Sequence, residues 1–199
     1  MREIKEILYN VNELSADAQE VAHQNWCGIQ CGFDDLEIAR DDIIELGNCL
    51  GINIDQVFYN GFGSYGDGLY VTGDYAYKPT WKDNIEVYAP MAEQLFELGE
   101  ALQKVNKKHG SFAVNITHGS GSGRYCHEHS VDMDYSDDDL YEEIGENALN
   151  EVSDLLRKFM TYSYRLLENE YNYQNSMGYF IESSLANEYE YYQNGRQYF

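Results

Sequence analysis

The chain has few basic residues, and this scarcity is the first constraint on its function. Its 199 residues include 13 Lys or Arg against 35 Asp or Glu, which gives a formal net charge of -22 at pH 7. A surface with this charge repels nucleic acids, anionic membranes and nucleotide phosphates, and it attracts basic proteins and cations. The composition therefore argues against direct nucleic-acid binding and favours a positively charged protein as the partner.

Long apolar runs and paired cysteine motifs are also missing. No stretch approaches the roughly 18 apolar residues that a membrane-spanning helix needs, and the N-terminal MREIKEILYN lacks the apolar run of a signal peptide. The four cysteines form no paired CxxC motifs, and a chain of this length accommodates them readily without a disulfide framework. We therefore expect a cytoplasmic protein that does not enter a membrane.

The chain does contain enough apolar material for a folded core. Hydrophobic residues make up 43% and aromatic residues 15% of the sequence, which is too much for a disordered chain, so the negative charge must lie on a folded body. The length suits one domain of ordinary size. We expect a single domain, with an α+β core over residues 1–135 and a helical region over residues 136–199 packed on it.

Apolar periodicity predicts helices and strands in the order ααββαββαα. The first helix begins after Ser15, which serves as its N-cap, and runs to about Cys31; the second ends at Gly51. β-Branched and aromatic runs predict two hairpins. Their strands are expected at residues 56–62 and 69–75, and at residues 111–117 and 124–134.

Three further helices are expected. Pro90 opens one that ends at Gly110, Ser136 begins a long one, and a final helix with a frayed end follows Asn175. The predicted fold is thus an antiparallel sheet of about four strands packed against helices, with a long C-terminal helix.

Acidic residues without nearby cations are the first candidate for a functional site. Residues 128–156 contain eleven Asp or Glu and no Lys or Arg. On a helix, acids three or four residues apart lie about 5 to 6 Å from one another, a spacing compatible with mimicry of a DNA backbone, where phosphates follow at about 3.4 Å per strand. The alternative is a solvated helix face. The candidate partner-binding residues are Asp34, Asp35, Asp41, Asp42, Asp132, Asp134, Asp137, Asp138, Asp139, Glu142, Glu143 and Glu146.

Three histidines are the second candidate. Regular alternation over residues 124–134 would place His127 and His129 on one face of a strand, and His118 on the paired strand could complete a three-imidazole Zn²⁺ site with an open position for hydrolysis. The alternative is that these histidines form hydrogen bonds within the sheet. Apart from this zinc, no cofactor is expected, because the glycine-rich loops at residues 61–68 and 119–123 lack the lysine and the strand-to-helix setting of phosphate-binding loops.

Two segments resemble small acidic proteins of bacteriophages and prophages. They are Phe58-Tyr59-Asn60-Gly61-Phe62-Gly63-Ser64-Tyr65-Gly66-Asp67-Gly68, similar to a Gly-Phe-x-Ser-x-Gly-Asp-Gly hairpin, and Arg124-Tyr125-Cys126-His127-Glu128-His129, similar to an Arg-Tyr-x-His strand. The resemblance covers residues 10–135 and implies a phage origin without an activity. Small acidic phage proteins commonly resemble DNA mimics that occupy the nucleic-acid channel of restriction, CRISPR or other defence complexes.

These observations favour a binding protein over an enzyme. The leading hypothesis is a phage-encoded inhibitor that binds a basic, nucleic-acid-binding defence protein of the host through an acidic, DNA-mimicking surface. The alternative is a metal-dependent hydrolase or nucleotide-binding protein that uses His118, His127 and His129. A third hypothesis is a self-associating structural or regulatory protein, for example a homodimer.

Overall fold

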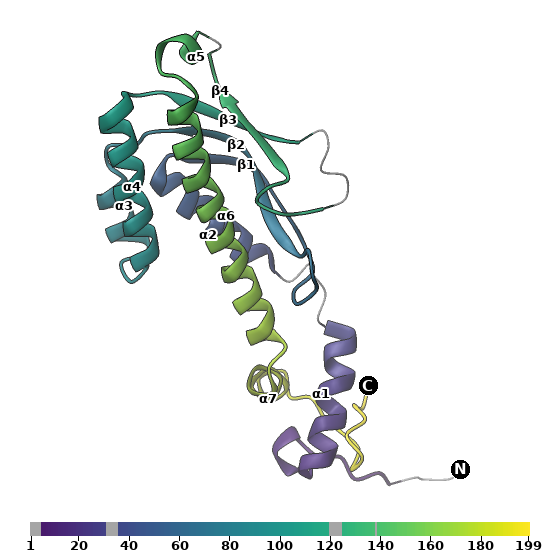
Figure 1. Cartoon of the computed structure of the whole chain (residues 1–199). Coiled ribbons are helices and arrows are strands. Elements are labelled where there is room, and N and C mark those ends of the chain that lie inside the picture. Colours follow the sequence, from purple (N-terminus) through teal and green to yellow (C-terminus); the bar gives the residue numbers. More distant parts are fainter. Residues whose placement is uncertain (1–4, 31–35, 120–124, 138) are drawn as a thin grey trace. The chain divides into compact units, whose positions relative to one another are not determined.

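A four-stranded antiparallel sheet and the helices that pack against it form the larger part of the fold (Figure 1). The computed structural model describes residues 5–30, 36–119, 125–137 and 139–199. The strands lie side by side in chain order, each antiparallel to the next. They are β1 (Ile52–Asn60), β2 (Gly68–Ala76), β3 (Ala113–His118) and β4 (Val131–Tyr135). The predicted α+β class with an antiparallel sheet of about four strands is confirmed.

The helices follow the predicted order, with short additional elements. They are η1 (Val11–Glu13), α1 (Ala16–Gln30), α2 (Glu37–Leu50), α3 (Trp81–Tyr88), α4 (Glu93–His109), α5 (Leu140–Glu143), α6 (Glu146–Gln174) and α7 (Met177–Ala186). Ser15 caps α1 as expected, because its Oγ accepts a hydrogen bond of 3.3 Å from the N–H of Ala18. Gly51 follows α2 with a φ of 85°, a conformation that favours glycine.

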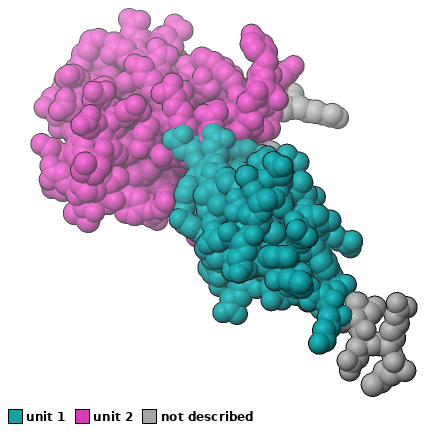
Figure 2. All heavy atoms as spheres, turned by 90° about the horizontal axis from the view of Figure 1, so that it is seen from below, with its two compact units in different colours: residues 1–37, 169–199 teal, residues 38–168 magenta. Residues whose placement is uncertain are grey.

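The chain divides into two compact units (Figure 2). Unit 1 comprises Met1–Glu37 and Asn169–Phe199, and unit 2 comprises Ile38–Glu168. The division expected at residue 135 differs from this one, because α6 supplies core residues to unit 2: Leu156 and Phe159 are 1% and 0% exposed.

In unit 2, one face of the sheet is buried. The side chains of β4 alternate regularly, with Val131, Met133 and Tyr135 buried and the two aspartates between them exposed. Helix α2 packs closely against β1 on the buried side, since a Cβ at Gly47 would lie only 2.7 Å from the side chain of Ile54.

In unit 1, the two ends of the chain form one apolar cluster. Trp26 from α1 contacts Phe180 from α7, with ring centroids 5.7 Å apart. Tyr191 is 1% exposed, and its backbone N–H donates a 2.8 Å hydrogen bond to the carbonyl of Tyr9. The prediction of a frayed C-terminal end is therefore wrong; an aromatic side chain anchors this segment, although the segment itself contains few aliphatic residues.

The strand expected over residues 124–134 is much shorter than predicted. Residues 127–130 form a turn before β4, closed by a 2.8 Å hydrogen bond from the N–H of Ser130 to the carbonyl of His127. The N–H of Gly119, just after β3, donates to the carbonyl of Ser130 over 2.9 Å. Strand alternation consequently does not decide where the imidazoles of His127 and His129 point.

Two helix starts also differ from the prediction. The long helix expected from Ser136 begins at Glu146, because Gly145 adopts a φ of 85° and separates α5 from α6. The helix expected from Pro90 begins at Glu93 and is preceded by the unpredicted α3. Helix α3 ends at Tyr88, because the next residue, Ala89, has a φ of -140°, which is not helical.

None of the described helices is both long and apolar enough to cross a membrane.

Candidate functional site

The face of the sheet opposite the core carries a row of carboxylates and amides. Asn53, Asp74, Asn115 and Asp134 are paired in register across the four strands, and Asn53 Nδ2 donates a 2.8 Å hydrogen bond to Asp74 Oδ1. Thr117 and Asp132 form the neighbouring β3–β4 pair on the same side. We call this surface the open sheet face, defined by Asn53, Asp74, Asn115, Thr117, Asp132 and Asp134.

The open sheet face has no basic residue of its own. None of the four strands contains a Lys or Arg. The basic side chains described in unit 2 lie on the helices or in the β2–α3 connection: Arg40, Lys78, Lys82, Lys104, Lys107, Lys108, Arg157, Lys158 and Arg165. In the described parts of the chain, their ion pairs are with helical acids only. Among the residues described in unit 2, the basic side chains therefore lie outside the strands, on the helices and in the β2–α3 connection.

The acidic segment after β4 continues this surface. The hydroxyl of Tyr141 on α5 donates to Asp134 Oδ1 over 3.4 Å, so α5 lies beside the end of the open sheet face. Partial burial and the adjacent Asp134 carboxylate raise the pKa of Tyr141. We define the acidic surface as the three aspartates of the open sheet face plus the exposed acids of this segment: Asp74, Asp132, Asp134, Asp137, Asp139, Glu142 and Glu143.

The structure does not place all predicted partner-binding residues together. Asp41 and Asp42 are exposed on α2, which packs on the opposite side of the sheet. Glu146 is the first residue of α6 and is separated from α5 by the break at Gly145, so the acids do not follow one continuous helix as predicted. Asp34, Asp35 and Asp138 lie outside the described residues.

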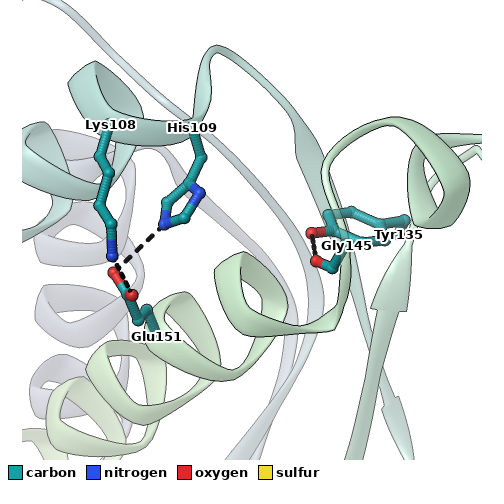
Figure 3. A network of polar contacts seen from close by, with 5 residues as sticks. All are labelled: Lys108, His109, Tyr135, Gly145 and Glu151. Atoms are coloured by element: carbon teal, nitrogen blue, oxygen red, sulfur yellow. Dashed lines mark hydrogen bonds and ion pairs between the residues drawn. The ribbon is translucent and has the colours of Figure 1, made fainter.

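Polar contacts hold the acidic segment in place (Figure 3). The hydroxyl of Tyr135 on β4 donates a 2.8 Å hydrogen bond to the carbonyl of Gly145. Lys108 and His109 at the end of α4 both reach Glu151 on α6. The hydrogen bond from Lys108 lowers the pKa of the Glu151 carboxyl. These groups join α4, α6 and the edge of the sheet, which is a structural role.

The turn before β4 brings together a second group of side chains. One donor atom from each of His127, Glu128 and His129 lies within 4.8 Å of the others, a separation from which a metal ion could be held. The third member of the predicted trio, His118, is not in this group; its ring lies 5.2 Å from that of Tyr70. Sequence reasoning missed Glu128 as a donor, because strand alternation would have pointed it away from the histidines.

Aromatic side chains of β1 and β2 contact one another at the hairpin that their sequence predicted. The rings of Phe58 and Tyr70 stack at 4.8 Å, while Tyr65 and Tyr125 are among the most exposed large side chains. At the hairpin tip, the carboxylate of Asp67 accepts a 2.6 Å hydrogen bond from the N–H of Ser64. The Gly-Asp-Gly pattern of this segment is thus explained by the turn, and the exposed tyrosines are available for contacts.

One family model matches residues 36–177, and its description is Domain of unknown function (DUF8835). The chain belongs to this DUF8835 family. The matched residues run from just before α2 to the first residue of α7. They include the whole of unit 2, with the acidic surface and the turn that carries His127, Glu128 and His129. No curated protein and no solved structure matches the chain. Helix α1 and all but the first residue of α7 lie outside the match.

Proposed function

We propose that this DUF8835 protein is a binding protein rather than an enzyme, and that it inhibits a basic, nucleic-acid-binding protein by occupying its nucleic-acid site. The observation that carries the proposal is the acidic surface on a sheet without Lys or Arg. A surface of one sign attracts a partner of the opposite sign, accelerates the encounter and disfavours partners of like charge.

The spacing of the carboxylates supports this function. Adjacent strands are about 4.8 Å apart and alternate residues of one strand about 6.6 Å apart. Asp132 and Asp134 are therefore separated by one such step along β4, and Asp74 lies two strands from Asp134. The acids of α5 add charge at the end of this array. Negative charges at intervals of a few ångströms are what a protein channel for a phosphate backbone is built to bind.

The resemblance to phage proteins makes defence proteins of the host cell the first partners to test. Restriction enzymes and CRISPR complexes bind nucleic acids in basic channels, which are complementary to the net charge of -22. This part of the proposal rests on the resemblance of the two segments alone.

The proposal is tested by competition for labelled duplex DNA on a restriction enzyme and on a CRISPR complex. We expect the untagged protein to displace the DNA, and the triple variant Asp74→Asn, Asp132→Asn, Asp134→Asn to need at least about ten times more protein, because three ion pairs of about 0.5 to 1 kcal/mol each are lost. Displacement should weaken steeply as salt is raised.

A matched control removes three charges from the helical layer instead. The variant Asp83→Asn, Glu93→Gln, Glu100→Gln changes exposed acids of α3 and α4 and has the same net charge as the test variant. It should displace DNA as well as the unmodified protein does. If both triple variants lose the same ability to displace DNA, the proposed site is refuted. If the unmodified protein displaces no nucleic acid from any basic partner, the proposed function is refuted.

A further inference from the structure

The turn that precedes β4 is held by contacts on both sides, which fixes the backbone of its histidines. The hydrogen bonds of Ser130 to His127 and of Gly119 to Ser130 close it against β3. On the other side it lies against the start of β2, because a Cβ at Gly68 would be 2.7 Å from the carbonyl oxygen of Cys126 and 3.1 Å from the Cα of His127. The backbone that carries the donor groups is therefore held in place before any ligand arrives.

Three consecutive side chains of this turn converge. The rings of His127 and His129 stack with centroids 5.4 Å apart and planes at 22°, and His127 Nδ1 lies 3.3 Å from Glu128 Oε2. His127 Nδ1 also accepts a 3.3 Å hydrogen bond from the backbone N–H of His129. An imidazole nitrogen that accepts a hydrogen bond is unprotonated, as metal binding requires, and a metal ion at this nitrogen would take the place of the N–H of His129.

The chemistry of the donors selects the class of ion. Two imidazole nitrogens and one carboxylate oxygen are ligands of Zn²⁺ and of neighbouring divalent transition metals. Cys126, although adjacent in sequence, is not among the side chains whose donor atoms converge. The strongly negative chain also raises the local concentration of cations.

The distances allow a site that closes around the ion. In a tetrahedral site with bonds of about 2.0 to 2.1 Å, donor atoms are about 3.3 Å apart. The present separations of up to 4.8 Å are longer than this, so the donor atoms must move closer together when an ion binds. Three protein ligands leave at least one coordination position for water.

We propose that His127, Glu128 and His129 form a binding site for a divalent transition-metal ion of the Zn²⁺ class. Glu128 replaces His118 as the third ligand of the site expected from the sequence. The site is independent of the proposed inhibition. The ion would link three adjacent side chains and so stiffen the turn. No reaction is needed for this role.

The test is a titration of the untagged protein with Zn²⁺ by calorimetry, and with Co²⁺ by visible absorption. We expect one ion per chain. His129→Gln, at an exposed position, and Glu128→Gln should each weaken binding about tenfold or more.

Two matched controls remove the same groups nearby: His118→Gln removes an imidazole outside the cluster, and Asp132→Asn removes one negative charge. Both should bind Zn²⁺ within about twofold of the unmodified protein.

Other outcomes overturn the proposal. It fails if Zn²⁺ does not bind stoichiometrically, if Glu128→Gln binds as tightly as the unmodified chain, or if His118→Gln loses as much affinity as His129→Gln. Circular dichroism of each variant verifies that it is folded. The imidazole resonances in NMR spectra should shift for His127 and His129 when Zn²⁺ is added, and an unchanged pair of resonances would also contradict the site.

Discussion

At the scale of single residues, Asp42 shows that a carboxylate that the sequence pattern places on an exposed helix face can already accept a hydrogen bond within the fold. The hydroxyl of Tyr88 on α3 donates a 2.8 Å hydrogen bond to Asp42 Oδ1 on α2. This hydrogen bond is the main reason why the pKa of Tyr88 is raised to about 12. This contact is shorter than the 3.4 Å from the Tyr141 hydroxyl to Asp134 on β4, which makes Asp42 the weaker candidate for binding another protein.

Replacing Asp42 by Asn should lower the pKa of Tyr88 toward the ordinary tyrosine value of about 10. Because the pKa in the folded state lies above that of the unfolded state, the contact stabilises the protein fully below pH 10 and loses its effect as the pH rises through about 12. A ¹³C NMR titration of tyrosine, assigned with Tyr88→Phe, measures the shift. Asp41→Asn, one position away, is the control and should leave the pKa of Tyr88 unchanged; an unchanged value in Asp42→Asn would contradict the contact.

The histidines show how far single residues could be predicted from the sequence. The His-x-His spacing correctly drew attention to His127 and His129, which the structure does bring together. Their expected companion was chosen by assuming a strand, and the turn selects Glu128 instead. A turn of four residues depends on contacts with β2 and β3 that no local pattern encodes.

At the scale of secondary-structure elements, the largest departure is the break between α5 and α6. Apolar residues at helical spacing continue through this point, with Leu140 and Ile144 before it and Ala148 after it, so periodicity alone predicts one helix. The positive φ of Gly145 ends that continuity, and the hydrogen bond from Tyr135 holds its carbonyl. Periodicity predicts which face of a helix is apolar, but it does not predict where the backbone leaves the helical conformation.

Replacing Gly145 by Ala distinguishes a broken helix from a continuous one by the sign of the change in the free energy of unfolding. A Cβ at Gly145 would meet no atom within 4 Å, so only the backbone conformation matters. With φ at 85°, alanine should destabilise unit 2 by about 1 kcal/mol. In a continuous helix, the same change would stabilise it by about 0.5 to 1 kcal/mol.

Urea denaturation followed by the fluorescence of Trp81, with Trp26 replaced by Phe, measures this change in unit 2. Gly145→Asn is the matched control, because asparagine adopts positive φ more readily than alanine and should cost less. A stabilising effect of Gly145→Ala would contradict the break.

At the scale of the whole molecule, the chain combines two cores, of which one lies within the DUF8835 match. The class and the approximate order of the longer elements were predictable from periodicity, since each of these elements carries its own pattern. The division into units was not, because the core of unit 1 depends on contacts between the first and last segments of the chain, such as those of Tyr9 with Tyr191. Residues so distant in sequence leave no local pattern.

The two tryptophans allow the cores to be followed separately. Trp26 lies in the cluster of unit 1 and Trp81 in the core of unit 2. In the Trp81→Phe background, Phe180→Ala should lower the urea midpoint reported by Trp26, because emptying a fully buried phenylalanine site costs about 3 to 5 kcal/mol. In the Trp26→Phe background, the midpoint reported by Trp81 should stay where it was.

The reciprocal variant completes this experiment. Ile85 on α3 is 0% exposed. Ile85→Ala should lower the urea midpoint reported by Trp81 by an amount that corresponds to about 2 to 5 kcal/mol, and it should leave the midpoint reported by Trp26 unchanged. If both midpoints move together in either variant, the two cores unfold as one cooperative unit, and α6, which contributes residues to both units, transmits the loss. Separate midpoints would mean that unit 1 can vary without affecting the sheet that carries the acidic surface.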